Sequence, residues 1–169
     1  MHLRPAADGD LEAMLARNAA EVPDVGPLTR PGLVALLAQC ELALVAVDDD
    51  GLLGLVLALA PGSDYASPNY RFFEDRGSDH LYVDRVAVAP RARRRGVASR
   101  LYDAVEERAR ATGRAEVTCE VNVEPPNEVS LAFHRARGFV EVGRQWHGDH
   151  RVALLARELP GADAGSSSA

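Results

Sequence analysis

The chain has 169 residues, of which 47% are hydrophobic and 26% charged, and this composition is typical of one globular domain with a hydrophobic core. The net charge of −6 argues against a general nucleic-acid binder, which must neutralise phosphates. No apolar run approaches the roughly 20 residues that span a bilayer, and no export signal is visible. Two cysteines, Cys40 and Cys119, predict buried free thiols. We therefore expect a cytoplasmic protein with no nucleic-acid, membrane or metal partner.

The N-terminal quarter predicts a short strand followed by two helices. Residues 2–6 form the expected strand, and Asp8 or Asp10 is placed to cap the first helix. Thr29 is a suitable cap for the second helix, with Pro31 in its first turn. Both helices carry leucines at helical spacing, so each has one face for the core.

A hairpin and a long insertion follow. Apolar runs at 42–47 and 52–59 flank the turn sequence at 48–51, Asp-Asp-Asp-Gly, which is typical of a β-hairpin. The insertion, residues 61–79, predicts a turn or two of helix at its centre. Loops of this length are usually functional, although a loop packed by its own side chains is the alternative. We expect some of the following side chains to line or cover a substrate pocket: Tyr65, Asn69, Tyr70, Phe72 and Phe73.

The next stretch, residues 83–113, changes from strand to helix at a basic loop. Valines at 83, 86 and 88 predict a strand that Pro90 ends. Four arginines within 91–95 precede Gly96, and an apolar stripe at four-residue spacing then predicts a helix that ends at Gly113. A glycine-bearing basic loop at a helix N-terminus predicts phosphate binding, because the first helical amides point outward. A basic turn on a solvated surface is the alternative.

The C-terminal third predicts a strand, a helix and two further strands. The strand covers 116–121, and the helix starts at Asn127 or Glu128 and is closed by Gly138. Its expected inward side chains are Val129, Ala132, Phe133 and Ala136. The last strands cover 139–145 and 152–159, and the small polar residues 160–169 predict a disordered tail.

Two motifs carry a family resemblance. The loop sequence Arg93-x-x-Gly96-x-Ala98 resembles the acetyl-CoA pyrophosphate loop of the GNAT family of N-acetyltransferases. The segment 127–139, N-x-x-S-x-x-F-H-x-x-x-G-F, is similar to the second motif of that family. The resemblance covers about 3–159 and implies an α/β GNAT fold in one domain, residues 1–159. It implies a mixed, mostly antiparallel twisted sheet of about seven strands, splayed at the acetyl-CoA site and flanked by about four helices, and a possible homodimer.

The resemblance also implies the coenzyme contacts. The strand backbone near Val86 and Val88 would hold the pantetheine arm, the loop and helix start would hold the pyrophosphate, and two residues of the second motif would touch the coenzyme nearby. The positions are Val86, Val88, Arg93, Arg94, Arg95, Gly96, Val97, Ala98, Ser99, Asn127 and Ser130. Acetyl-CoA is the expected co-substrate, and no metal is expected.

The catalytic candidates are one histidine and two carboxylates. His134 stands where the family carries a tyrosine that protonates the leaving thiolate, so an imidazolium is expected to replace that phenol. Alternatively, His134 is a packing residue and the thiolate leaves unassisted. Glu120 resembles the base of ribosomal-protein alanine N-acetyltransferases, and Asp84 is its competitor. The structural alternative for both carboxylates is pairing with an arginine.

The resemblance implies transfer of an acetyl group from acetyl-CoA to a primary amine of a small molecule or peptide, by direct attack through a tetrahedral intermediate. A second hypothesis is a non-catalytic acyl-CoA-binding or regulatory module that kept the fold. The sequence leaves the acceptor amine open.

Overall fold

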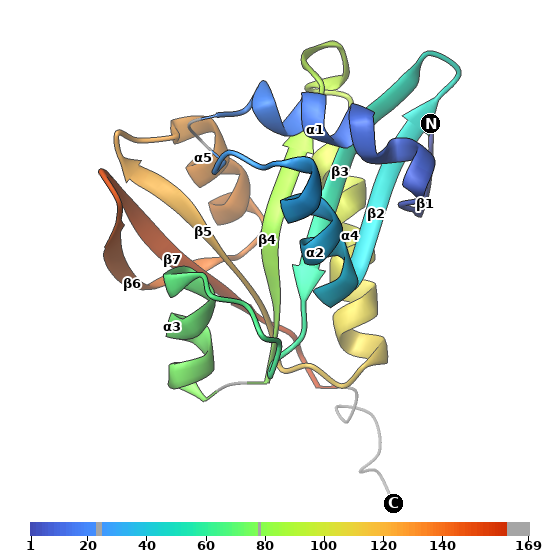
Figure 1. Cartoon of the computed structure of the whole chain (residues 1–169). Helices are drawn as coiled ribbons and strands as arrows, with labels where there is room; N and C mark the ends of the chain where they lie inside the picture. Colours follow the sequence, from blue (N-terminus) through green and yellow to red (C-terminus); the bar gives the residue numbers. More distant parts are fainter. Residues whose placement is uncertain (23–24, 78, 162–169) are drawn as a thin grey trace, which may run out of the picture.

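The computed structural model describes residues 1–22, 25–77 and 79–161. Its centre is one sheet with the strand order β1-β2-β3-β4-β5-β7-β6 (Figure 1). The strands are β1 (His2–Pro5), β2 (Cys40–Asp48), β3 (Gly51–Leu59), β4 (His80–Val88), β5 (Glu116–Glu124), β6 (Val140–His147) and β7 (His150–Glu158). All neighbours are antiparallel except β4 and β5, which are parallel. The expected mixed, mostly antiparallel sheet of seven strands is confirmed.

Five α-helices cover the two faces of this sheet, one more than the approximate number expected. They are α1 (Leu11–Ala19), α2 (Arg30–Gln39), α3 (Pro68–Arg76), α4 (Val97–Ala111) and α5 (Glu128–Ala136). Side chains of α1, α2 and α3 join one buried apolar cluster, and those of α4 and α5 pack in another. In Figure 1, α1 and α2 accordingly lie in front of the sheet and α4 lies behind it.

Capping explains one helix start but not the other. The Thr29 side chain accepts a hydrogen bond from Gly32 N at 3.1 Å, as predicted for α2. The predicted acidic cap of α1 is wrong, because that helix has no side-chain cap. The carboxylate of Asp10 instead lies 2.7 Å from the Arg4 guanidinium and accepts a bond from Ala7 N at 2.8 Å. The Arg4 guanidinium of β1 therefore binds the Asp10 carboxylate that was expected to cap α1.

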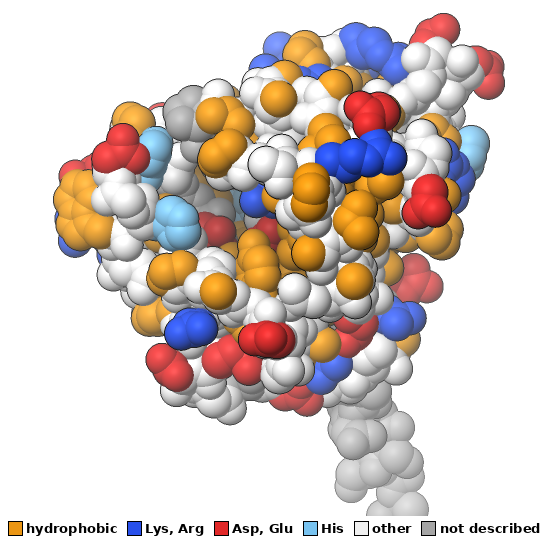
Figure 2. Space-filling model, in the orientation of Figure 1, with side chains coloured by type: hydrophobic (Ala, Val, Ile, Leu, Met, Phe, Trp, Pro, Cys, Tyr) orange, Lys and Arg blue, Asp and Glu red, His pale blue; other side chains and the backbone are white. Residues whose placement is uncertain are grey.

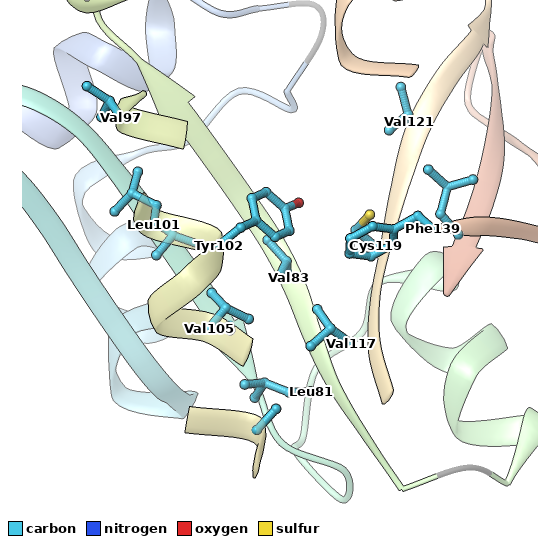
Figure 3. Packing of buried hydrophobic residues seen from close by; sticks show 14 of the residues in the cluster. Leu81, Val83, Val97, Leu101, Tyr102, Val105, Val117, Cys119, Val121 and Phe139 are labelled. Atoms are coloured by element: carbon cyan, nitrogen blue, oxygen red, sulfur yellow. The ribbon is translucent and has the colours of Figure 1, made fainter. Parts of the chain in front are cut away.

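The predicted stripe of α4 is confirmed as its core face. Val97, Leu101, Val105 and Ala109 are each at most 1% exposed (Figure 3). Gly54 on β3 lets this helix lie close to the sheet, since a Cβ there would lie 3.1 Å from the Val97 side chain and 3.4 Å from that of Leu101.

The inward face of α5 differs from the prediction. Val129 is 83% exposed, and Ala132 and Ala136 are exposed as well. The buried residue is His134, whose ring lies 5.2 Å from that of Phe139, centroid to centroid. Phe133, the fourth residue expected to face inward, is partly buried against the core as predicted. An imidazole has apolar faces that pack against aromatic rings, so this helix also buries a histidine that was not expected there.

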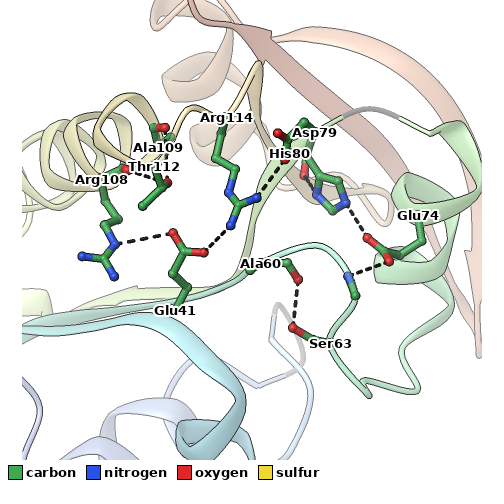
Figure 4. Close-up of polar contacts among 12 residues, drawn as sticks. Glu41, Ala60, Ser63, Glu74, Asp79, His80, Arg108, Ala109, Thr112 and Arg114 are labelled. Atoms are coloured by element: carbon green, nitrogen blue, oxygen red, sulfur yellow. Dashed lines mark hydrogen bonds and ion pairs between the residues drawn. The ribbon is translucent and has the colours of Figure 1, made fainter.

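β4 and β5 pair at one end and diverge at the other. Among the described residues, pairing covers His80–Tyr82 with Glu116–Thr118. Charged groups hold the paired end together (Figure 4). The Arg114 guanidinium, just before β5, lies 2.6 Å from the Glu41 carboxylate on β2 and 2.9 Å from that of Asp79, just before β4. The splayed sheet that was expected is therefore present, with its closed end fixed by ion pairs.

A β-bulge lies in β4 where the strands begin to diverge. Val83 and Arg85 pair with the consecutive residues Ala58 and Leu57 of β3, so Asp84 is the extra residue. As a result, Tyr82 and Val86 belong to the apolar clusters on opposite faces of the sheet. Strict alternation along β4 would have placed the side chains of Tyr82 and Val86 on one face of the sheet.

Three further expectations have separate outcomes. Cys40 and Cys119 are free thiols, half-buried and buried respectively. Within the described ranges, no helix is both long and apolar enough to cross a membrane. The predicted disordered tail lies mostly outside the described residues, which end at 161.

Candidate active site

The divergence of β4 and β5 opens a cleft of about 760 Å³. Its walls come from both faces of the sheet: Tyr102 of α4 and His134 of α5 from one face, and Tyr65 and Asn69 from the other. The β6–β7 turn, residues 147–150, completes the wall. Figure 2 shows a hollow on the face that carries α1 and α2, with acidic side chains visible in its depth. The cleft therefore lies between the diverging strands and is lined from both faces of the sheet.

Two carboxylates face this cleft, one from each diverging strand. Asp84 Oδ1 accepts a hydrogen bond of 2.7 Å from the Tyr65 hydroxyl, and Asp84 Oδ2 lies 3.1 Å from Arg85 Nε. Glu120 Oε2 accepts a hydrogen bond of 2.7 Å from the Tyr82 hydroxyl. The bulge at Asp84 turns its side chain out of the regular alternation of β4, which brings it into the same cleft as Glu120.

Burial and the charge of Asp84 keep Glu120 protonated to higher pH. Burial, and secondly the charge of Asp84, raise the pKa of Glu120 to about 8, against the opposing hydrogen bond from Tyr82. Burial also raises the pKa of Asp84, although the charge of Arg85 opposes this. Glu120 can therefore change its protonation state near neutral pH, which an ordinary surface glutamate does not do.

The predicted coenzyme loop has the backbone of an anion site. Arg94 and Gly96 have φ angles of 60° and 76°, so both lie in the left-handed region, and Gly96 directly precedes α4. Nothing lies within 4 Å of the position that a Gly96 Cβ would take, so the loop is open there. The Val97 side chain is buried, which leaves its backbone as the part that can meet a ligand.

The arginines of this loop divide into two groups. Arg91 pairs with Asp48, and Arg93 pairs with Glu21, each with closest atoms 3.2 Å apart. Arg94 and Arg95 are exposed at the helix start, beside Ala98 and Ser99 in the first turn of α4. Cations for a phosphate group are therefore present directly before Gly96.

The second motif places three residues in the cleft wall. Asn127 caps α5 through a hydrogen bond of 3.1 Å from Ser130 N. His134 is 3% exposed, its Nδ1 lies 2.8 Å from Ser130 O, and its Nε2 lies 2.7 Å from the Tyr102 hydroxyl. A carbonyl only accepts, so Nδ1 carries a proton and Tyr102 donates to Nε2 of the neutral ring. Burial lowers the pKa of His134, with the charge of Arg137 as a further cause and the bond to Ser130 opposing them.

The insertion residues separate into three environments. Tyr65 and Asn69 line the cleft, and Asn69 Oδ1 accepts a hydrogen bond of 2.7 Å from Gln145 Nε2. Tyr70 and Phe73 are at most 1% exposed and belong to the apolar cluster beneath α1 and α2. Phe72 packs against β6, so closely that a Cβ on Gly143 would lie 2.7 Å from its ring.

Sequence reasoning missed Tyr102 and undervalued Tyr82. Tyr82 binds the Glu120 carboxylate, and Tyr102 binds His134. Tyr102 directly follows Leu101 of the apolar stripe of α4. This position could have identified Tyr102 as a buried aromatic ring that carries a polar hydroxyl into the core. No group of three His, Cys, Asp or Glu side chains in the described part of the chain could hold a metal ion.

Comparison with solved structures agrees with this architecture. The Escherichia coli ribosomal-protein-S18-alanine N-acetyltransferase superposes with a TM-score of 0.74 at 13% identity, over 99% of each chain. Naa20 of Chaetomium thermophilum, in complex with a bisubstrate analogue, gives 0.76 at 21% identity, over 94% of this chain and 87% of that one. The NatC complex bound to Gag peptide and CoA gives 0.75 at 17% identity, over 94% and 98%. At these identities the likeness shows a shared fold.

Family comparison is more specific. No curated protein matches the sequence. The model of the acetyltransferase (GNAT) family matches residues 17–139, which include both motifs, both cleft carboxylates and His134. The resemblance inferred from the two motifs is confirmed, and the chain belongs to the GNAT acetyltransferase family.

Proposed function

We propose that this protein transfers the acetyl group of acetyl-CoA to the N-terminal α-amine of a peptide. The observation that carries the proposal is the placement of Glu120, with a pKa of about 8, in the wall of the cleft between the diverging strands. Membership of the family supports acetyl transfer. Structural neighbours described with a peptide and CoA, or with a bisubstrate analogue, support the choice of acceptor.

The coenzyme would enter from the α4–α5 face. The backbone of β4 near Val86 and Val88 would hold the pantetheine arm, because β5 no longer pairs with the strand there. The pyrophosphate would lie at the start of α4, where Gly96 leaves room and helix amides point outward. The side chains expected to contribute nearby are Arg93, Arg94, Arg95, Ser99, Asn127 and Ser130.

Glu120 would act as the general base. An ammonium has no lone pair, so it must lose a proton before it attacks the thioester carbon. The Glu120 carboxylate, directly or through a water, takes that proton while the Tyr82 hydroxyl fixes its orientation. Asp84 lies opposite and raises the pKa of Glu120 by its charge, which makes Glu120 the stronger base.

The pKa values of the two kinds of amine make an α-amine an easier acceptor for this base than a lysine side chain. α-Amino groups have pKa values of about 7.7–8.0, whereas that of lysine is about 10.4. A carboxyl group with a pKa of about 8 therefore takes a proton from an α-ammonium at almost no free-energy cost. The same transfer from a lysine would cost roughly 3 kcal/mol more, at about 1.4 kcal/mol for each pKa unit.

An acceptor panel tests the proposed reaction. Purified protein is incubated with acetyl-CoA and peptides that differ in their first residues, and thiol release and acetylated product are measured. Matched peptides with a blocked N-terminus and a free lysine, and small-molecule amines, are the controls. Acetylation of free N-termini supports the proposal, and acetylation confined to lysines or small amines refutes the choice of acceptor. Acetyl-CoA binding without transfer to any amine would identify a non-catalytic coenzyme-binding module.

Two isosteric variants test the assignment of the base. Glu120→Gln should lower turnover by roughly 100-fold or more, with the loss smallest at high pH, where free amine is already present. Glu124→Gln is the matched control, because Glu124 lies on the same strand but is exposed. If Glu120→Gln keeps full activity while Asp84→Asn is inactive, Asp84 is the base.

A further inference from the structure

The histidine at the tyrosine position of the second motif lies in the cleft wall, but its ring has no free nitrogen. Both ring nitrogens of His134 have partners, Ser130 on one side and Tyr102 on the other. The ring is 3% exposed, and aromatic rings surround it. His134 therefore has no free N–H with which to meet a sulfur atom in the cleft.

Tyr102 brings a hydroxyl to the same cleft wall, within hydrogen-bond distance of His134. Its ring is 1% exposed, and its oxygen points from α4 towards β5, between the diverging strands (Figure 3). Tyr102 lines the cleft together with Cys119 and Val83. The hydroxyl also interacts with the Cys119 thiol, so it already lies beside a sulfur atom at this point of the cleft.

We propose that Tyr102 is the catalytic residue that protonates the leaving sulfur, and that His134 supplies the proton through the Tyr102 hydroxyl. The proposal rests on the acetyl transfer proposed above, and it assigns the acid to α4 in place of α5. His134 acts through Tyr102 and touches no substrate atom.

The proposed step balances as follows. The carbon–sulfur bond of the tetrahedral intermediate breaks, and its electron pair goes to sulfur. Sulfur takes the hydroxyl proton of Tyr102, and the Tyr102 oxygen takes the Nε2 proton of a cationic His134. The products are the CoA thiol, a neutral imidazole and a tyrosine hydroxyl that donates to Nε2, which is the arrangement in the structure. After the thiol leaves, water in the cleft returns a proton to His134 through the same hydroxyl.

The charges around the pair determine its pH dependence. Directly after α5, Arg137 lies with its guanidinium carbon 5.6 Å from the centroid of the Tyr102 ring, and from β5, Cys119 and Glu120 face the hydroxyl. The cation of Arg137 is in turn held by Asp103 and Glu106 of α4, at 2.8 and 2.7 Å. Burial and Arg137 both disfavour a cationic His134 and lower its pKa below the ordinary 6.5, so proton supply should fail as pH rises through a value on the acid side of neutrality.

Tyr102→Phe keeps the ring and removes only the hydroxyl. We expect turnover to fall by roughly 100-fold, at the lower end for a general acid because a thiolate is a fair leaving group, with little change in KM for acetyl-CoA. Tyr102→Phe and His134→Gln should each remove the alkaline limb of the pH profile, and the double variant should lose no more than the worse single variant. Thr118→Val is the matched control, because it removes another buried hydroxyl near an imidazole, at 3.2 Å from His80.

A titration without turnover tests the contact with sulfur. The thiol of bound CoA is titrated by the ultraviolet absorbance of its thiolate. A hydroxyl that donates to sulfur lowers the pKa of this thiol, so the pKa should be higher in Tyr102→Phe than in the wild type and in Thr118→Val. Equal pKa values, or unchanged turnover and pH profile in Tyr102→Phe, would overturn the proposal. If the wild type is active and these results are obtained, the proposed acetyl transfer still stands and only the assignment of Tyr102 as the acid is wrong.

Discussion

Replacing Glu120 by glutamine should stabilise the folded protein at high pH. The carboxyl group has an ordinary pKa of 4.5, which burial and the charge of Asp84 raise to about 8 in the fold. Between these values the folded protein keeps a proton that the unfolded chain has lost, so wild-type stability falls as pH rises. Each pH unit costs the wild type about 1.4 kcal/mol, and the total approaches about 5 kcal/mol above pH 8. This is an upper limit, since Glu120 is only half-buried.

Urea unfolding of the two proteins measures this effect. The free energies of unfolding of wild type and Glu120→Gln are compared in buffers near pH 5, 7 and 9. The glutamine amide still accepts a hydrogen bond from Tyr82, so the two should be nearly equal near pH 5 and should diverge in favour of the variant as pH rises. Glu124→Gln, on the exposed end of β5, controls for the loss of any carboxylate. A difference between wild type and Glu120→Gln that is the same at all three pH values would refute the reasoning.

Three further predictions concern the loop, the acceptor side and the core. Gly96→Glu should abolish acetyl-CoA binding in calorimetry, whereas Gly96→Ala, which shares the strain of a φ of 76° but adds no charge, should retain part of it. Tyr65→Phe removes the hydroxyl that binds Asp84 and should raise the KM of the acceptor more than that of acetyl-CoA; equal increases would count against an acceptor role. Leu101→Ala should lower the free energy of unfolding by about 2–5 kcal/mol in urea, because its side chain is fully buried under α4.

The sequence predicted most of the fold because its strongest patterns are local. The α4 stripe, the Thr29 cap and the Asp-Asp-Asp-Gly hairpin each depend on neighbouring residues, and all three are present. The predictions failed where a residue far away in the sequence determines the local structure. The bulge at Asp84 depends on pairing with β3, and the salt bridge from Arg4 removed Asp10 from its expected cap.

For the same reason, the sequence predicted only part of the candidate site. Glu120 and Asp84 could be named as rival bases, but their common cleft and the influence of one on the pKa of the other follow from two strands that diverge. The partner of His134 comes from α4, 32 residues earlier in the chain. A motif written along one segment cannot show a contact from another, so Tyr102 escaped notice.

The unpaired half of β4 leaves a gap in the hydrogen bonding of the sheet. Exposed strand edges usually invite aggregation, but this one lies in the wall of the cleft. A ligand that pairs there acts as a temporary eighth strand. It raises the free energy of unfolding by about 2.7 kcal/mol at a concentration 100 times its Kd. If acetyl-CoA is that ligand, the folded fraction of a destabilised variant in a cell would depend on the concentration of acetyl-CoA. A fall in acetyl-CoA would then lower the amount of folded variant before its catalytic activity became limiting.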